Sequence, residues 1–410
     1  MRRRNVSYTA TEETRSPEDP QCLVVDVEKS VDFQKKTRRK STSWLQWCCR
    51  ISTYVLLLSV LVWAVSWIQI LVEEYHYRSI QRVMDKRKTA CARPAWQKLQ
   101  FPTCNLLHEI DLPHLEQRHA TGSSLGFLAN GYWRDVWAVD SSSSYNNETA
   151  VLKIMRLKHD IDAHNFDRHR RDGLVMERLT ASPHVIDPYG FCGNSVLTEF
   201  LSKTLDKVAK GLDPSLVKYT RTRLDRLQLA LGAARGLAAL HEIPGGPIIH
   251  VDLGARQFLV GEDGNVKIND FNRCRFMGYY KTTKQPCDFR IQIAPGTDRA
   301  PEEYRELPSQ NEKLDLFSFG NVLYIILTGR EPWPYYYWGY AEPIIQRLII
   351  WGIKPSLPQR VRRSDPELSE LMYLLYALNP DDRPSAADVV RSIERILDKE
   401  NVAHAISLSK

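Results

Sequence analysis

The sequence predicts an α+β protein with two lobes behind a single transmembrane helix. Three observations support this prediction. An apolar run without charges spans residues 51–72, and short runs rich in β-branched residues follow from about residue 125. Longer segments with the apolar spacing of helices fill the rest of the chain. A small β-rich lobe followed by a larger helical lobe is the chain order of an α+β fold.

The composition excludes several classes of protein. Hydrophobic residues make up 43% and charged residues 26% of the 410 residues, which is typical of a folded globular chain. The net charge is +7, and residues 1–50 carry more than half of it. The remaining body is close to neutral, whereas nucleic-acid binding needs a basic face, so we expect no nucleic-acid partner.

The apolar run at 51–72 is long enough to cross a bilayer. A helix of this length reaches roughly 33 Å, against about 30 Å for the hydrocarbon core. Trp44 and Trp47 precede the run, and Tyr75 and Tyr77 follow it, where interfacial aromatic residues are common. We therefore predict a single-pass membrane protein, with the lipid bilayer as a partner.

The charges on the two sides of the span predict its orientation. Six basic residues lie shortly before the span, whereas four basic and three acidic residues lie shortly after it. The positive-inside rule then places the N-terminus in the cytosol and the body in the lumen or outside the cell. The inverted topology, with a cytosolic body, is the alternative.

The cysteines and one sequon agree with a lumenal body. In an oxidising compartment, Cys91 with Cys104 and Cys274 with Cys287 would close two short loops and leave Cys192 free. Asn147 begins an Asn-Glu-Thr triplet in a Ser-rich turn, which makes it a candidate glycosylation site.

The body reads as strands followed by helices. We expect strands at Val136–Val139 and Ala150–Met155 on either side of the polar turn Ser141–Thr149, and a further strand at Val196–Leu201. Helical spacing then predicts helices at Leu216–His241, Leu314–Thr328, Leu368–Leu378 and Ala386–Leu397.

Two carboxylates in the middle of the body carry the chemistry. His250-Val251-Asp252-Leu253 leads through a Gly-rich hairpin turn to the strand Val266–Ile268 and to Asn269-Asp270-Phe271-Asn272. This pattern resembles the catalytic loop and the D-F-G segment of protein kinases. The resemblance implies that Asp252 is the catalytic base and that Asp270 is a Mg²⁺ ligand. Gln257, at the position of the family's Asn, would hold a second Mg²⁺.

Four further motifs occur in the family's order. Ala150-Val151-Leu152-Lys153 resembles the V-A-I-K strand, so Lys153 would contact the α- and β-phosphates of ATP. The other three are similar to the A-P-E segment, to the helix start D-x-W-S-F-G and to the late N-P-x-x-R-P turn. They imply a pair between Glu302 and Arg383. The residues to which the resemblance gives a structural role are His250, Glu302, Asp315 and Arg383.

The ATP site departs from the family pattern at the glycine loop. Gly131 alone remains of three glycines in Leu128-Ala129-Asn130-Gly131-Tyr132-Trp133-Arg134-Asp135-Val136. Thr198 would be the gatekeeper, and the acid of the family's αC helix would be Asp172, or Glu177 in a shifted register. The residues expected to bind ATP are Leu128, Gly131, Val136, Ala150, Lys153, Thr198, Glu199, Leu201 and Leu259.

The catalytic loop also bears on the acceptor and on regulation. Gly254-Ala255-Arg256 resembles the A-A-R of tyrosine kinases, so Arg256 is a candidate catalytic residue. Arg256-Gln257-Phe258 is similar to a segment of secretory-pathway kinases of the vertebrate lonesome kinase type. Val251 replaces the Arg that usually receives an activation-loop phosphate. The candidate phosphorylation sites are Tyr279, Tyr280, Thr282 and Thr283.

The resemblance therefore implies a membrane-anchored protein kinase that uses ATP and Mg²⁺, acts on a protein substrate and slightly prefers tyrosine. The alternative is a weakly active pseudokinase that serves as an ATP-binding membrane scaffold. The sequence does not indicate an oligomeric state. The expected parts are a disordered cytosolic tail (1–50), the span (51–72), a stalk (73–119), a kinase domain (120–398, with lobes 120–200 and 201–398) and a short tail (399–410).

Overall fold

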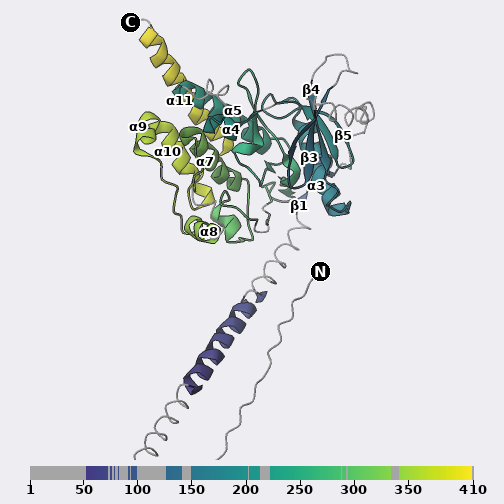
Figure 1. Cartoon of the computed structure of the whole chain (residues 1–410), viewed down its shortest axis with the longest axis vertical. Helices are drawn as coiled ribbons and strands as arrows, with labels where there is room; N and C mark the ends of the chain where they lie inside the picture. Colours follow the sequence, from purple (N-terminus) through teal and green to yellow (C-terminus); the bar gives the residue numbers. More distant parts are fainter. Residues whose placement is uncertain are drawn as a thin grey trace, which may run out of the picture. The chain divides into compact units, whose positions relative to one another are not determined.

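The structure is a computed structural model, in which the chain divides into two compact units, Met1–Ser79 and Ile80–Lys410 (Figure 1). It describes residues 52–72, isolated residues between 74 and 82, residues 91–98 except 93, and residues 126–408 except 141–148, 202, 213–221, 288, 292–293 and 334–340. The expected cytosolic tail, Asn147 and most of the expected stalk lie outside the described residues.

One helix in the first unit has the length and composition of a membrane span. It covers Ser52–Val72, and its side chains are exposed in the isolated chain. Among the described residues no other helix meets this description. The helix coincides with the predicted apolar run, whose first residue lies outside the described residues.

An antiparallel sheet of five strands forms the first lobe of the second unit. Its strand order is β2-β3-β4-β6-β5, and the central strand β4 is almost entirely buried because its Val, Leu and Ile side chains are covered on both faces. Helix α3 (Ala163–Leu179) packs beside this sheet in Figure 1, and Asp162 caps its N-terminus through the Asn165 N–H. The strands are β2 (Phe127–Asn130), β3 (Arg134–Asp140), β4 (Thr149–Met155), β5 (Pro188–Cys192) and β6 (Ser195–Glu199).

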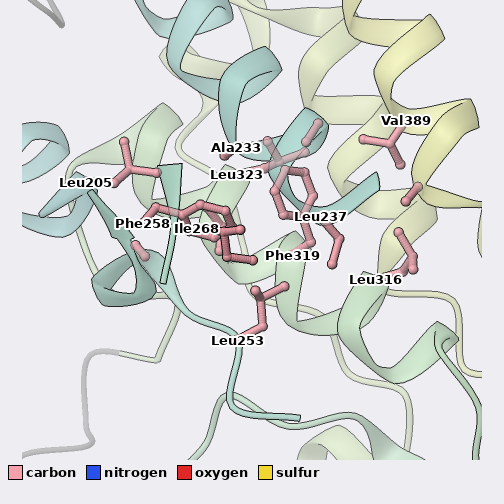
Figure 2. Close-up of a cluster of buried hydrophobic side chains, with 14 of the residues drawn as sticks. Leu205, Ala233, Leu237, Leu253, Phe258, Ile268, Leu316, Phe319, Leu323 and Val389 are labelled. Carbon is pink, nitrogen blue, oxygen red and sulfur yellow. The ribbon is translucent and has the colours of Figure 1, made fainter. Parts of the chain in front are cut away.

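Helices build the second lobe around α5 (Arg223–His241) and α7 (Lys313–Thr328). Thr222 and Asp225 form a capping box that starts α5, and α7 is buried on nearly all sides. Their apolar side chains meet those of β9, β10 and α11 in one core (Figure 2). The other helices are α4 (Leu205–Lys210), α6 (Pro301–Tyr304), α8 (Glu342–Ile350), α9 (Gln359–Ser364), α10 (Pro366–Leu375) and α11 (Ala386–Leu408).

Short strands frame the segments of this lobe that carry Asp252 and Asp270. The loop after β8 (Ile248–Ile249) contains Asp252, and β9 (Phe258–Val260) pairs with β10 (Val266–Ile268) directly before Asp270. The remaining pairs are β7 (Lys203–Thr204) with β9, β11 (Arg275–Phe276) with β8, and β1 (Cys91–Ala92) with β12 (Tyr279–Tyr280). Single 3-10 turns complete the elements at Ala95–Lys98, Ala255–Gln257, Phe271–Arg273 and Pro380–Asp382.

The predicted elements are present with shifted ends. The strand predicted to reach Leu201 ends at Glu199, and the last helix continues past Leu397 to Leu408. The helix predicted from Leu216 begins at Arg223, because Thr222 supplies the cap there, and residues 213–221 lie outside the described part. The Leu368–Leu378 helix is observed as Pro366–Leu375.

The disulfide pairing expected from short sequence distances is wrong. Cys91 bonds Cys287 across 196 residues, Cys192 is also disulfide-bonded, and Cys274 is a buried free thiol. The reason is topological: strand β1 pairs with β12, which brings Cys91 next to the segment that follows β12. Residues 91–98 of the expected stalk therefore pack onto the second lobe.

Candidate active site

Asp315, at the start of α7, fixes the loop that carries Asp252. Its fully buried carboxylate accepts hydrogen bonds from the backbone N–H groups of His250 (2.7 Å) and Val251 (2.9 Å), and it pairs with the His241 ring at 3.0 Å. Val251 has a φ of 70°, which is unfavourable for a β-branched residue. These bonds offset that strain and hold the loop in one conformation.

Two arginines hold the carboxylate of Asp252. Its Oδ1 accepts from Arg299 Nη2 at 3.0 Å and from Arg273 Nη1 at 3.3 Å. Burial acts to raise the pKa of Asp252, but the charges of Arg273, Arg299 and His250 outweigh burial and keep this pKa below its usual value. Asp252 is therefore ionised at neutral pH, as a hydroxyl-orienting base must be.

Asp270 is placed by an unusual backbone conformation. Its φ of 67° and ψ of 65° lie in the left-handed region, and Asn272 Nδ2 donates a hydrogen bond to its Oδ1. Burial raises the pKa of Asp270, and the Lys153 charge opposes this.

Lys153, on β4, reaches the same segment from the first lobe. Its Nζ donates to Asn269 Oδ1 at 2.7 Å, and the side chain is almost fully buried. Burial lowers the pKa of Lys153, while Asp172 and Asp270 act in the opposite direction. His250 Nε2 lies 3.0 Å from the carbonyl oxygen of Asn269. Both lobes therefore contact the residue that precedes Asp270.

Asp172 forms an ion pair, but with a residue that the sequence did not indicate. Its Oδ2 lies 2.5 Å from Arg134 Nη1 on β3, and its Oδ1 accepts the Phe271 N–H at 2.8 Å. No ion pair joins Lys153 to Asp172 among the described residues. The alternative acid, Glu177, is exposed on α3. The available signal was Arg134 itself, which occupies the position of the third glycine in the family's loop.

The residues expected to bind ATP lie on strands of the first-lobe sheet, in the β2–β3 turn, just after β6 and on β9. Thr198 is buried on β6 beside Val151 of β4, and its hydroxyl donates to the Glu199 carbonyl at 3.2 Å. The Glu199 N–H is bonded to Asp187 O, whereas no hydrogen bond in the described residues uses the Leu201 N–H. Val136 pairs with Lys153 across β3 and β4. The other expected contacts are Leu128 on β2, Gly131 in the β2–β3 turn, Ala150 on β4 and Leu259 on β9.

The predicted contact between Glu302 and Arg383 is present. The buried guanidinium of Arg383 donates to both carboxylate oxygens of Glu302, at 2.6 and 2.8 Å. A buried bidentate pair is specific in geometry. It ties α6 to the turn that precedes α11.

The remaining predicted residues are more accessible. Arg256 is exposed, and Gln257 is half-buried with its backbone bonded to Gly254 and Asn269. Tyr279 and Tyr280 are half-buried in β12, whereas Thr282 and Thr283 are exposed in the following turn.

The oxygen donors present here fit a magnesium ion and a nucleotide. Mg²⁺ usually takes one or two carboxylates plus phosphate and water oxygens. The Asp270 carboxylate is a donor of this kind, and the Gln257 amide oxygen is the second donor that the resemblance implies. No cluster of three or more His, Cys, Asp or Glu able to hold a metal occurs within the described residues, so an all-protein metal cage is not formed there. The buried ammonium of Lys153 is suited to phosphate oxygens.

Comparison with known proteins matches this region to one family. Residues 122–393 match the family model of the protein tyrosine and serine/threonine kinases. The chain is 33% identical to the nodulation receptor kinase of Pisum sativum over 43% of this chain and 20% of that protein. It is 27% identical to the dual specificity protein kinase shkD of Dictyostelium discoideum, over 66% of this chain and 34% of that protein. A probable tyrosine-protein kinase of Dictyostelium discoideum is 27% identical over 56% of this chain and 70% of that protein. The chain spans between 20% and 45% of the length of the first three curated relatives it matches.

Proposed function

Because the chain belongs to the protein tyrosine and serine/threonine kinase family, we propose that it transfers the γ-phosphoryl group of ATP to a protein hydroxyl. The observation that carries this proposal is the set of contacts on Asn269–Phe271. Lys153 binds the side chain of Asn269, His250 binds its carbonyl oxygen, and Asp172 accepts the Phe271 N–H. The two lobes are thereby joined at Asp270.

Each charged group then has a role in phosphoryl transfer. When bound, ATP would supply the γ-phosphoryl group and leave as ADP, and Mg²⁺ would offset the charge of the phosphates. Asp270 and Gln257 would hold the metal, and the Lys153 ammonium would bind phosphate oxygens. Asp252, ionised between Arg273 and Arg299, orients the acceptor hydroxyl and accepts its proton.

One observation favours tyrosine as the acceptor: Gly254-Ala255-Arg256 is similar to the catalytic loop of tyrosine kinases. The relatives include serine/threonine kinases as well as a dual specificity kinase and a probable tyrosine-protein kinase, so they agree with either acceptor. Incubation of the full chain with ATP, Mg²⁺ and a mixed peptide library tests this preference. We expect most of the transferred phosphate on tyrosine. Phosphate found mainly on serine and threonine would refute the preference but not the kinase activity.

The helix Ser52–Val72 anchors the enzyme with its kinase domain in the lumen or outside the cell. The charge asymmetry around the helix supports this orientation, and so do the disulfide bonds of Cys91, Cys192 and Cys287, which require an oxidising compartment. Protease protection of intact vesicles with a C-terminal tag tests it. We expect the tag to be protected until detergent is added, and digestion of the tag without detergent would mean a cytosolic kinase.

The alternative scaffold function also has support in the structure. The Gly131 N–H donates to the Arg134 carbonyl at 2.8 Å, so this loop amide is not directed at a phosphate. Asn272 occupies one oxygen of Asp270. A protein with these features that binds ATP without transferring phosphate would serve as a membrane-anchored scaffold.

A further inference from the structure

Side chains of the turn between β2 and β3 fix this turn to α3. The glycines that the family has in this loop could not make such contacts. Arg134 occupies the position of the third glycine of the loop, and its side chain is 6% exposed. Next to it, the ring of Trp133 lies 4.0 Å from the guanidinium of Arg168 on α3. The turn therefore makes an ionic and a cation–π contact with the same helix.

The ion pair of Arg134 continues into the segment of Asp270. Arg134 Nη1 lies 2.5 Å from Asp172 Oδ2, and Asp172 Oδ1 accepts the Phe271 N–H at 2.8 Å. Asp172 has no exposed surface. One carboxylate thus connects β3, α3 and the residue after Asp270.

Because Arg134 pairs with Asp172, Lys153 forms no ion pair with this carboxylate in the described part of the chain. Its Nζ binds the neutral Asn269 side chain at 2.7 Å. An aspartate is one carbon–carbon bond, about 1.5 Å, shorter than a glutamate, and the long arginine side chain makes up that distance from the other side. The four buried charged groups are two cations, Arg134 and Lys153, and two carboxylates, Asp172 and Asp270. Their charges balance, as burial requires.

We propose that Arg134 is a positioning residue that replaces Lys153 as the ion-pair partner of Asp172. It holds α3 and the Asn269–Phe271 segment in place and leaves the Lys153 ammonium for phosphate oxygens. The kinetic part of this inference rests on the proposed kinase activity, whereas the structural part does not.

Hydrogen exchange of the Phe271 amide in the nucleotide-free full chain tests the structural part. In Arg134→Met, Asp172 loses its partner, and we expect this amide to exchange at least tenfold faster. Arg134→Lys retains a cation and should stay within threefold of the wild type. The control is Arg235→Met, which breaks an exposed ion pair with Glu394 and should change nothing at Phe271.

Steady-state kinetics test the second part. In Arg134→Met the unpaired Asp172 attracts Lys153, so KM for ATP should rise about tenfold. In Arg134→Met/Asp172→Glu the longer acid reaches Lys153, and this new ion pair holds α3 in place. The double variant should therefore regain protection of the Phe271 amide but not the full affinity for ATP. If the single variant does not melt cooperatively, the double variant and Arg134→Lys are compared alone.

The inference would be overturned if Arg134→Met matched Arg235→Met in Phe271 exchange. It would equally be overturned if Arg134→Lys lost protection as far as Arg134→Met, or if the double variant regained none. Absence of phosphate transfer in every variant, with the expected exchange pattern, would refute the proposed activity and leave the positioning role intact.

Discussion

Arg299 lies next to Asp252, the candidate base, and contacts three residues. It donates to the Val251 carbonyl at 2.8 Å and to Asp252 at 3.0 Å, and it lies 3.5 Å from Glu303. Burial raises the pKa of Glu303 to about 7, although the Arg299 charge opposes this. The carboxylate of Asp252 is therefore held by a residue of the A-P-E region, and the catalytic loop and α6 act together.

His169 on α3 gives a prediction for stability against pH. The ring is buried beside Arg134, and neither nitrogen has a hydrogen-bond partner within the described residues. Burial, and then the Arg134 charge, lowers its pKa from 6.5 to about 3. Below pH 6.5 the unfolded chain therefore binds a proton at His169, whereas the folded chain does not. The folded state loses stability as the pH falls. The loss is about 1.4 kcal/mol per pH unit.

The comparison that isolates this effect is wild type against His169→Leu. Glu303 acts in the opposite direction, because its raised pKa stabilises the fold as the pH falls from about 7 to 4.5. Since Glu303 is common to both proteins, it cancels in the difference. Denaturant melts between pH 6.5 and 4.5 should show the variant gaining on the wild type at each step. Parallel curves would mean that His169 is protonated in the folded protein.

Single residues differ in how well the sequence indicates them. Lys153, Asp252 and Asp270 lie in ordered motifs that resemble those of protein kinases, and this resemblance predicts their roles. Arg134 is a departure from the glycine-loop motif and Arg299 directly precedes the A-P-E segment, so no motif indicates their partners, which lie 38 and 47 residues away. Such contacts depend on how β3 lies against α3 and how α6 lies against the catalytic loop. Side-chain reach in the folded chain decides them.

Residues 91–98 are an element that periodicity did not indicate. Strand β1 pairs with β12, and the Trp96 ring lies 5.2 Å from that of Phe276. Arg170 on α3 donates to the Gln97 carbonyl at 3.4 Å. This short segment thus contacts both α3 and the chain after Asp270. These two parts also contact each other, because Arg171 donates to the carbonyl of Cys274, 103 residues further along the chain. A two-residue strand is too short to produce a pattern in the sequence.

The disulfide of Cys91, the first residue of this segment, should contribute strongly to stability. It closes a loop with a separation of 196 residues, and a crosslink of this kind typically adds about 2–4 kcal/mol by restricting the unfolded chain. Cys91→Ser/Cys287→Ser should therefore lower Tm by roughly 4–16 °C. The control is the same comparison in reductant, where the two proteins should melt together. Equal melting temperatures under oxidising conditions would contradict the assignment.

The chain after Asp270 carries the candidate phosphorylation sites, and we expect phosphorylation there to be dispensable. Tyr279 and Tyr280 are half-buried in β12, and Val251 replaces the usual phosphate-binding arginine. Replacing both tyrosines with Phe, and Thr282 and Thr283 with Ala, should leave kcat/KM within roughly fivefold. A hundredfold loss, with an unchanged melt, would show that other cations bind a phosphate. The candidates are Arg171 and Arg275, which both donate to the Cys274 carbonyl.

At the scale of the whole molecule, the order of the elements could be predicted and their cross-links could not. The change from alternating strands to helical spacing near residue 200 indicated two lobes, because each element buries one face. The pairing of β1 with β12 and the Cys91–Cys287 bond join chain segments that no local pattern relates. The helix Ser52–Val72 followed from composition alone.

The central claim is that the protein transfers phosphate with Asp252 as the base. Phosphate transfer by the purified full chain, compared with that of the Asp252→Asn variant, tests it most directly. Asn keeps the shape of the side chain but cannot accept the hydroxyl proton, so the variant should bind ATP as the wild type does and transfer phosphate at least ~100-fold more slowly. The wild type should label itself or a generic protein substrate with γ-phosphate. If the wild type binds ATP but transfers no more phosphate than Asp252→Asn, the protein is a scaffold and the catalytic account is wrong.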